Sequence, residues 1–202
     1  RDIDCIPSSF YESGEYRKKL NQSLVLNSAL HEQDSIQKYM IQSIGGTDKI
    51  RNKVIVDVGC GAGSLLDAIS GIAEKTIGVE PCEPYRSSLR NRGYEVFSSI
   101  KEATLKYKGS VDMAISSQVI EHVDDPKGFL YEIYNLIKPS GKSIISTPNR
   151  NDILKSLLPE FNSFFYRSQH KWYFNEKSIR NCVKQTEFKV NKIEYIHRYG
   201  MA

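Results

Sequence analysis

VIVDVGCGAGSLL, residues 54–66, is the stretch that decides the fold. Its first half is a β-branched, apolar run typical of a buried strand. Three glycines then follow within five residues, and a helical pattern begins at Ser64. A glycine-rich turn between a strand and a helix lets a ligand approach the main chain, and the first N–H groups of the helix attract an anionic group. We therefore expect a ligand to contact the backbone of this turn.

Two common nucleotide-binding motifs do not fit the turn. The NAD fingerprint needs a glycine at the sixth position from Gly59, where this chain has Ser64. A phosphate-binding P-loop needs Gly-Lys-Ser/Thr at its end, and no lysine stands there. Both patterns argue against recognition through nucleotide phosphates.

Strand-like and helical patterns alternate along the middle of the chain. Five short β-branched runs predict strands over residues 53–58, 76–80, 94–97, 111–116 and 142–147, and helices are predicted over 64–70, 84–92 and 126–138. Such alternation requires right-handed crossovers. We predict an α/β fold: a Rossmann-like, doubly wound, mostly parallel sheet with helices on both faces. Ligands of such sheets lie outside the carboxyl ends of the strands.

The two ends of the chain depart from this regular pattern. Residues 1–50 are predicted to form an N-terminal helical lid segment with a helix over 32–44, and the aromatic stretch 10–17 would close over a bound ligand. Residues 51–202 form the predicted core, which ends with a helix over 176–185 and a strand over 188–196.

Composition excludes several classes of protein. The 202 residues, 40% of them hydrophobic, suffice for one domain with its own core, and no apolar run approaches the roughly 20 residues of a membrane span. The four cysteines lie far apart with no Cys-x-x-Cys pair, which excludes a thiolate zinc cage and favours a reducing, cytoplasmic location. The charge of +4 arises from dispersed basic residues, so nucleic acid is a disfavoured partner.

The glycine turn and a later acidic residue together resemble class I S-adenosylmethionine-dependent methyltransferases. Asp57 precedes the glycines, and Glu80 ends the second predicted strand, 21 residues after Gly59. The resemblance implies that the turn holds the methionine part of the cofactor, that Asp57 receives its ammonium group, and that Glu80 accepts hydrogen bonds from both ribose hydroxyls. Ser99 would replace the aspartate that many relatives place near the adenine. The implied cofactor-binding residues are Asp57, Gly59, Cys60, Gly61, Gly63, Glu80, Pro81, Ser99, Ile100, Ser117, Gln118 and Val119.

Later segments are similar to one subgroup of that family, which includes the ubiquinone-pathway O-methyltransferases. The similar segments are VDMAISSQVIEHVDDP (111–126), LIKPSGKSIISTPNR (136–150), and His170 with the following 174–179. Methyl transfer to a hydroxyl is an in-line displacement in which the protein aligns the acceptor and removes its proton. The candidate catalytic residues are His122, His170 and the neighbouring Glu121, because histidine is the natural base near neutral pH. Two alternatives stay open: His122 orients the next helix, and His170 pins the long loop.

A metal site is the second interpretation of the same residues. Some ubiquinone-pathway enzymes and the small-RNA 2′-O-methyltransferases carry Glu-x-x-Glu-His plus a later histidine, which ligate a divalent ion. Here Gln118 replaces the first carboxylate. Because hard cations prefer anionic oxygen ligands, we expect no metal and an activity that survives chelation.

Aromatic residues gather where the family places its acceptor. Seven of the fourteen residues from Phe161 to Phe174 are aromatic. Such rings can stack on a planar or sugar-like acceptor, and they can equally cover the core or form a homodimer contact.

The sequence thus predicts an S-adenosylmethionine-dependent methyltransferase that releases S-adenosylhomocysteine and modifies a small molecule. We expect O-methylation, with a sugar or polysaccharide precursor as the favoured acceptor. The alternatives are RNA 2′-O-methylation and a non-catalytic, cofactor-binding partner subunit. The chain begins with Arg1 and offers six strands where the family's sheet usually has seven, so we expect an excerpt of a longer protein.

Overall fold

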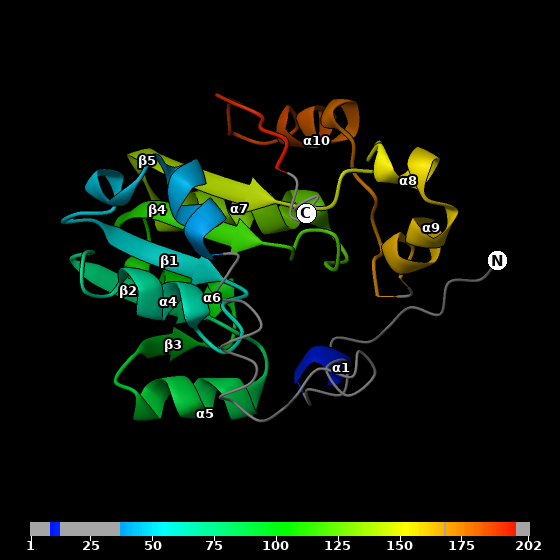
Figure 1. Ribbon diagram of the computed structural model, residues 1–202. Coiled ribbons are helices and arrows are strands. Elements are labelled where there is room, and N and C mark those ends of the chain that lie inside the picture. The colour runs from blue at the N-terminus through cyan, green and yellow to red at the C-terminus, as the bar shows by residue number, and fades with distance from the viewer. Residues whose placement is uncertain (1–8, 13–36, 168, 197–202) are drawn as a thin grey trace.

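A five-stranded parallel sheet forms the centre of the computed structural model, which describes residues 9–12, 37–167 and 169–196 (Figure 1). Each neighbouring pair of strands is parallel, in the order β3-β2-β1-β4-β5. The strands are β1 (Val54–Val58), β2 (Lys75–Val79), β3 (Glu95–Phe97), β4 (Val111–Ser117) and β5 (Ile137–Ser146). The predicted α/β fold is therefore confirmed.

Helices cover both faces of the sheet (Figure 1). Successive strand residues point to opposite faces, so Val56 packs against α6 and α7 while Ile55 packs against α4 and the helical residues 37–44. The described helices with printed bounds are α1 (Ser9–Glu12), α4 (Ser64–Ile69), α5 (Glu83–Asn91), α6 (Ile100–Tyr107), α7 (Pro126–Leu136), α8 (Leu154–Leu157), α9 (Pro159–Phe165), α10 (Glu176–Val183) and the 3-10 helix η1 (Thr47–Lys49).

The register brings the carboxyl ends of three strands into one row. Val58 pairs with Val79, and Val79 pairs with Phe97. The turns that follow β1, β2 and β3 therefore leave the sheet side by side, as expected for the ligand-binding edge of such a fold.

The predicted final strand is wrong. No strand forms over residues 188–196. Instead, Phe188 packs edge-to-face on Tyr134 of α7, with ring centroids 5.5 Å apart, and the Tyr195 hydroxyl donates to Glu176 of α10 at 2.6 Å. These side chains hold the segment against α7 and α10, so its alternating pattern serves contacts with helices.

Other boundaries also moved. Helix α6 was not predicted, and β5 begins at Ile137, which pairs with Val111, where the sequence predicted a strand from 142. Only residues 37–44 of the predicted helix 32–44, and 10–12 of the lid stretch 10–17, lie within the described residues. Among the described helices, none has the length and apolarity to cross a membrane.

Candidate functional site

The turn after β1 has the backbone conformation that its glycines permit. Gly59, Gly61 and Gly63 have φ values of 79°, 54° and 91°, in the left-handed region. A Cβ added to Gly59 would lie 2.3 Å from Cγ2 of Val119. The turn therefore packs directly against the loop after β4, and a side chain at Gly59 would separate the two.

Cys60 takes part in this turn through its backbone. Its side chain is buried, and a Cβ added to Gly78 of β2 would lie 2.9 Å from Cys60 Sγ. Burial raises the pKa of the Cys60 thiol, with added contributions from the nearby Asp57 and Glu80 carboxylates. The thiol is thus an inert packing group.

Glu80 joins the turns after β1 and β2. The side chain is almost fully buried, and its Oε2 accepts from the Gly61 N–H at 2.8 Å while its Oε1 accepts from the Cys82 N–H at 2.9 Å. Its own N–H donates to the carbonyl of Phe97, at the end of β3. The carboxylate is therefore fixed at the point where three strand ends meet.

Asp57 is a second buried carboxyl group beside Glu80. Burial, together with the nearby charge of Glu80, raises the pKa of Asp57 from 3.8 to about 7. Asp57 and Glu80 are only 5% and 3% exposed. Two buried acidic groups favour a cationic ligand group, because a cation would stabilise their ionised forms.

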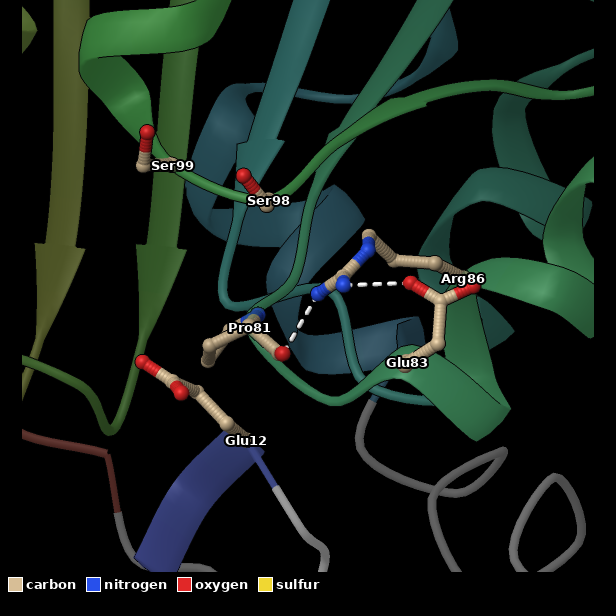
Figure 2. Close-up of a pocket in the computed structure, with 6 residues that line it drawn as sticks. All are labelled: Glu12, Pro81, Glu83, Arg86, Ser98 and Ser99. Carbon is tan, nitrogen blue, oxygen red and sulfur yellow. Dashed lines mark hydrogen bonds and ion pairs between the residues drawn. The ribbon is translucent and has the colours of Figure 1, made fainter. Parts of the chain in front are cut away.

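An open pocket of about 470 Å³ lies at the turns that follow β2 and β3 (Figure 2). Its volume suits one small ligand. Four of the lining residues were not among the predicted site residues: Glu12, Glu83, Arg86 and Ser98. The full lining is Glu12, Pro81, Glu83, Arg86, Ser98 and Ser99.

The two serines after β3 are occupied by contacts with α6. The Ser99 hydroxyl accepts from the Glu102 N–H at 3.2 Å and so caps the helix, and the Ser98 hydroxyl donates to Oε2 of Glu102 at 2.7 Å. Ile100 buries its side chain in the core. Ser99 therefore lines the pocket while its hydroxyl caps α6, and Ile100 belongs to the core.

The loop after β4 starts with a strained residue. Gln118 has a φ of 58°, which is uncommon for a residue with a side chain, and its N–H donates to the carbonyl of Ser146 at 2.9 Å. The Ser117 hydroxyl lies 3.0 Å from that of Ser146. These contacts join the ends of β4 and β5 and direct Val119 toward Gly59.

His122 of this loop contacts His170, with ring centroids 4.8 Å apart and ring planes at 73°. His122 Nδ1 lies 2.9 Å from the Gln169 carbonyl, and the Lys171 and Trp172 N–H groups donate to the Glu121 carbonyl. Two loops that lie some fifty residues apart in sequence are thus held together by hydrogen bonds on both sides of the histidine pair.

Both imidazoles are neutral at neutral pH. Burial lowers the pKa of His122, and burial together with the neighbouring His122 lowers the pKa of His170 to about 4. Glu121 is buried, accepts from the Thr147 hydroxyl at 3.1 Å, and has Oε1 4.0 Å from His122 Nε2. Neutral imidazole can accept a proton, and the nearby carboxylate would stabilise the resulting cation.

The same three side chains are arranged so that they could hold an ion. The ligand atoms of Glu121, His122 and His170 lie within 4.8 Å of one another. Gln118, which stands where some relatives have a carboxylate, points its amide nitrogen toward Ser146 Oγ at 3.5 Å. The cluster therefore offers one carboxylate and two nitrogens.

Aromatic rings extend the site from His170 outward. Tyr173 contacts His170 at 5.5 Å between ring centroids and Tyr166 at 5.1 Å, and Lys155 Nζ lies 4.5 Å above the Tyr166 ring. The Tyr173 hydroxyl is bound by the N–H and carbonyl of Arg167. The predicted aromatic wall thus begins at the histidine pair, with Tyr166 and Trp172 exposed at its rim.

Comparisons with known proteins relate the chain to methyltransferases. The family model described as "Methyltransferase domain" matches residues 31–193. The chain is 29% identical over 120 residues to a ubiquinone biosynthesis O-methyltransferase of Escherichia coli, which covers 56% of the chain and 49% of that protein. It is 33% identical over 152 residues to a probable S-adenosylmethionine-dependent methyltransferase of Mycolicibacterium smegmatis, covering 73% of the chain and 57% of that protein. The chain spans about half the length of these curated relatives.

Solved structures show the same fold. A SAM-dependent methyltransferase from Archaeoglobus fulgidus superposes with a TM-score of 0.67 at 21% identity, covering 93% of this chain and 79% of that one. Magnesium protoporphyrin IX methyltransferase from Synechocystis, solved with bound SAH, gives a TM-score of 0.63 at 13% identity, covering 88% and 86%.

Proposed function

The chain belongs to the family of S-adenosylmethionine-dependent methyltransferase domains, and from this premise we propose that it transfers a methyl group from S-adenosylmethionine to a hydroxyl of a small molecule. The observation that carries the proposal is the arrangement at one edge of the sheet. The buried pair of Asp57 and Glu80 lies at this edge. Val119 connects the glycine turn to His122: its side chain packs against Gly59, and its carbonyl accepts from the His122 N–H at 2.8 Å.

The residues present fit the cofactor. Asp57 would bind the ammonium group, and this contact would favour the ionised carboxylate that burial disfavours. Glu80 would accept from the ribose hydroxyls with its remaining lone pairs, since each of its oxygens already accepts from one backbone N–H. The open pocket lined by Pro81 and Ser99 has room for the adenine.

His122 is the better base on local geometry. The cofactor supplies a methyl group already activated on a sulfonium, so the protein must align the acceptor and take up its proton. The contact of Nδ1 with the Gln169 carbonyl requires the proton on Nδ1, which leaves the Nε2 lone pair for the acceptor hydroxyl. Glu121 stabilises the imidazolium formed in this step. His170 would then line the acceptor side of the pair.

The aromatic wall beyond His170 supports the acceptor class that we propose. Tyr173 and Tyr166 offer ring faces, and Lys155 adds a cation at the rim. Aromatic faces with polar groups at their edge suit a sugar ring or a planar phenol. We favour a sugar or polysaccharide precursor.

The cluster of Glu121, His122 and His170 favours one second candidate, a metal-assisted transfer of the kind used on RNA 2′-hydroxyls. In that case the same atoms would hold a divalent ion that activates the hydroxyl. Only one of the three ligands is anionic, which weakens the site for a hard cation.

The experiment is methyl transfer from labelled S-adenosylmethionine to a panel of hydroxylated small molecules and to RNA, each with and without EDTA. The proposal predicts an O-methyl product on a small molecule that forms in EDTA. Label that enters RNA alone and only when a metal is present would support the second candidate and overturn the first.

A further inference from the structure

Helix α5 carries two arginines that reach the two turns of the site from the same helix. Arg86 lies in its middle, and Arg92 directly follows its last residue. Neither was a predicted site residue. Their partners lie in different turns, one after β2 and one after β1.

Arg86 holds the turn after β2. Its Nη1 donates to the Glu80 carbonyl at 2.8 Å. Nη1 also donates to the Pro81 carbonyl, and Nη2 pairs with Glu83 (Figure 2). The side chain is only 12% exposed, and it also lines the pocket. Arg86 thus fixes the peptide groups before and after Pro81. The Glu80 N–H is fixed separately, because it donates to the Phe97 carbonyl.

Arg92 holds the glycine turn. Its Nη1 donates to Oδ2 of Asp67 at 2.6 Å, and its Nη2 donates to the carbonyl of Ala62. The next N–H, that of Gly63, donates to the Cys60 carbonyl at 2.9 Å. The peptide between Ala62 and Gly63 is therefore held at its oxygen and at its nitrogen. Asp67 is itself positioned by the Tyr94 hydroxyl at 2.7 Å.

We propose that Arg86 and Arg92 are positioning residues for S-adenosylmethionine, each for a different half of the cofactor. This inference rests on the proposed function. Arg86 orders the turn that would meet the ribose and adenine, while Arg92 orders the turn that would meet the methionine part. Neither residue needs to touch the methyl group.

The reason is preorganisation. Three glycines with left-handed φ values make the turn after β1 costly to order, because glycine has more conformational freedom to lose than any other residue. A guanidinium that already fixes the carbonyls removes that cost from the binding step. Hydrogen bonds from a charged donor are also stronger than those from a neutral one.

The test is calorimetric titration of the purified chain with two ligands, S-adenosylhomocysteine and methylthioadenosine, which lacks the amino-acid part. Arg86→Ala should weaken both ligands in parallel, by about tenfold, or ~1.4 kcal/mol. Arg92→Ala should weaken S-adenosylhomocysteine by about the same factor and leave methylthioadenosine within about twofold of wild type. Arg86→Lys and Arg92→Lys, which keep the charge but lose the planar fork, should bind with intermediate affinity.

Arg90→Ala is the matched control. Arg90 lies on the same helix, is half exposed, and pairs only with Glu83 among the described residues, so neither ligand should lose affinity. Thermal melting of each unliganded variant identifies misfolding. If an alanine variant is misfolded, the affinities of the corresponding lysine variant decide the result. Wild-type affinity of both ligands for the alanine or lysine variants would overturn the inference, as would parallel loss of both ligands in the Arg92 variants. Failure of the wild-type chain to bind S-adenosylhomocysteine would overturn the proposed function and this inference with it.

Discussion

The imidazole of His122 donates its Nδ1–H to the carbonyl oxygen of Gln169, 2.9 Å away. This bond crosses from the loop after β4 to the loop that carries His170, and it fixes the tautomer that leaves Nε2 able to accept a proton. One contact therefore has two effects: it pins the long loop, a role that the sequence had offered for His170, and it prepares the His122 ring as a base.

His122→Ala is the first prediction. Removing the base should lower kcat by about 10²- to 10⁴-fold while leaving the Kd of S-adenosylhomocysteine near that of wild type. His170→Ala should lower kcat less, because its Nδ1 is buried without a hydrogen-bond partner among the described residues. Steady-state kinetics and calorimetry on both variants check this, and full activity in both would remove the base assignment.

The affinity for S-adenosylhomocysteine should depend on pH through Asp57. Its pKa is raised to about 7 by burial and by Glu80, so the carboxyl group is mainly protonated at pH 6 and cannot pair with the ammonium group. Affinity should therefore rise as the pH increases from 5.5 to 7, by up to about tenfold per unit, and level off above 7.5. Binding isotherms across this range, with Asp57→Asn as control, test it. A flat profile for the wild-type chain contradicts the role given to Asp57.

Asp57 should also shape the stability of the unliganded chain. Its folded-state pKa lies above the unfolded value near 3.8, so the folded state holds a proton more tightly between these values. Stability should accordingly decline as pH rises from about 4 to about 7 through this group, and Asp57→Asn should remove that decline. Chemical denaturation at several pH values measures both slopes, and identical slopes for the two chains would show that Asp57 does not titrate in this range.

Chelation should leave activity intact. Glu121, His122 and His170 come together, but they provide only one carboxylate, and Gln118 adds no charge. Activity measured after dialysis against EDTA should match that of untreated protein. Its abolition, followed by recovery on addition of a divalent metal, would replace the base mechanism with a metal-assisted one.

Gly59→Ala should destabilise the fold and weaken cofactor binding. The new methyl group would lie 2.3 Å from Val119, and the residue would keep a φ near 79°. We expect a loss of more than about 1 kcal/mol of unfolding free energy, of which Val119→Ala in the same chain restores only part, because the backbone strain stays. Gly71→Ala, where an added Cβ meets nothing within 4 Å, is the control. Equal melting temperatures for Gly59→Ala and wild type would contradict the packing described.

The sequence was most informative where the determinants are local. Strands β1 and β2 were predicted to within about one residue because short runs rich in β-branched residues mark both strands. Asp57 and Glu80 could be found because the turn and the strand end lie within a short motif. Helix α6 escaped detection because its lysines and glutamate dilute the apolar pattern, and its start depends on the Ser99 cap.

The rest depends on contacts that no short motif encodes. The strand predicted over 188–196 has an alternating pattern, yet Phe188 and Tyr195 bind to α7 and α10, which the sequence could not place. The roles of Arg86 and Arg92 could not be predicted, because an arginine on an amphipathic helix ordinarily faces solvent. Their contacts with the two turns depend on where α5 packs in the folded chain. The contact of His122 with Gln169 likewise spans 47 residues and needed the folded chain.

The most direct test of the account is calorimetric titration of S-adenosylhomocysteine into the wild-type chain and into Glu80→Ala and Glu80→Gln. Glu80 accepts from the N–H groups of Gly61 and Cys82; the glutamine variant keeps one acceptor oxygen and the alanine variant keeps none, so the two variants remove the acceptors in two steps. The account predicts saturable one-to-one binding to wild type, weakened at least about tenfold by either substitution and more by alanine. Absence of binding to the wild-type chain, or equal affinity in all three, would contradict it.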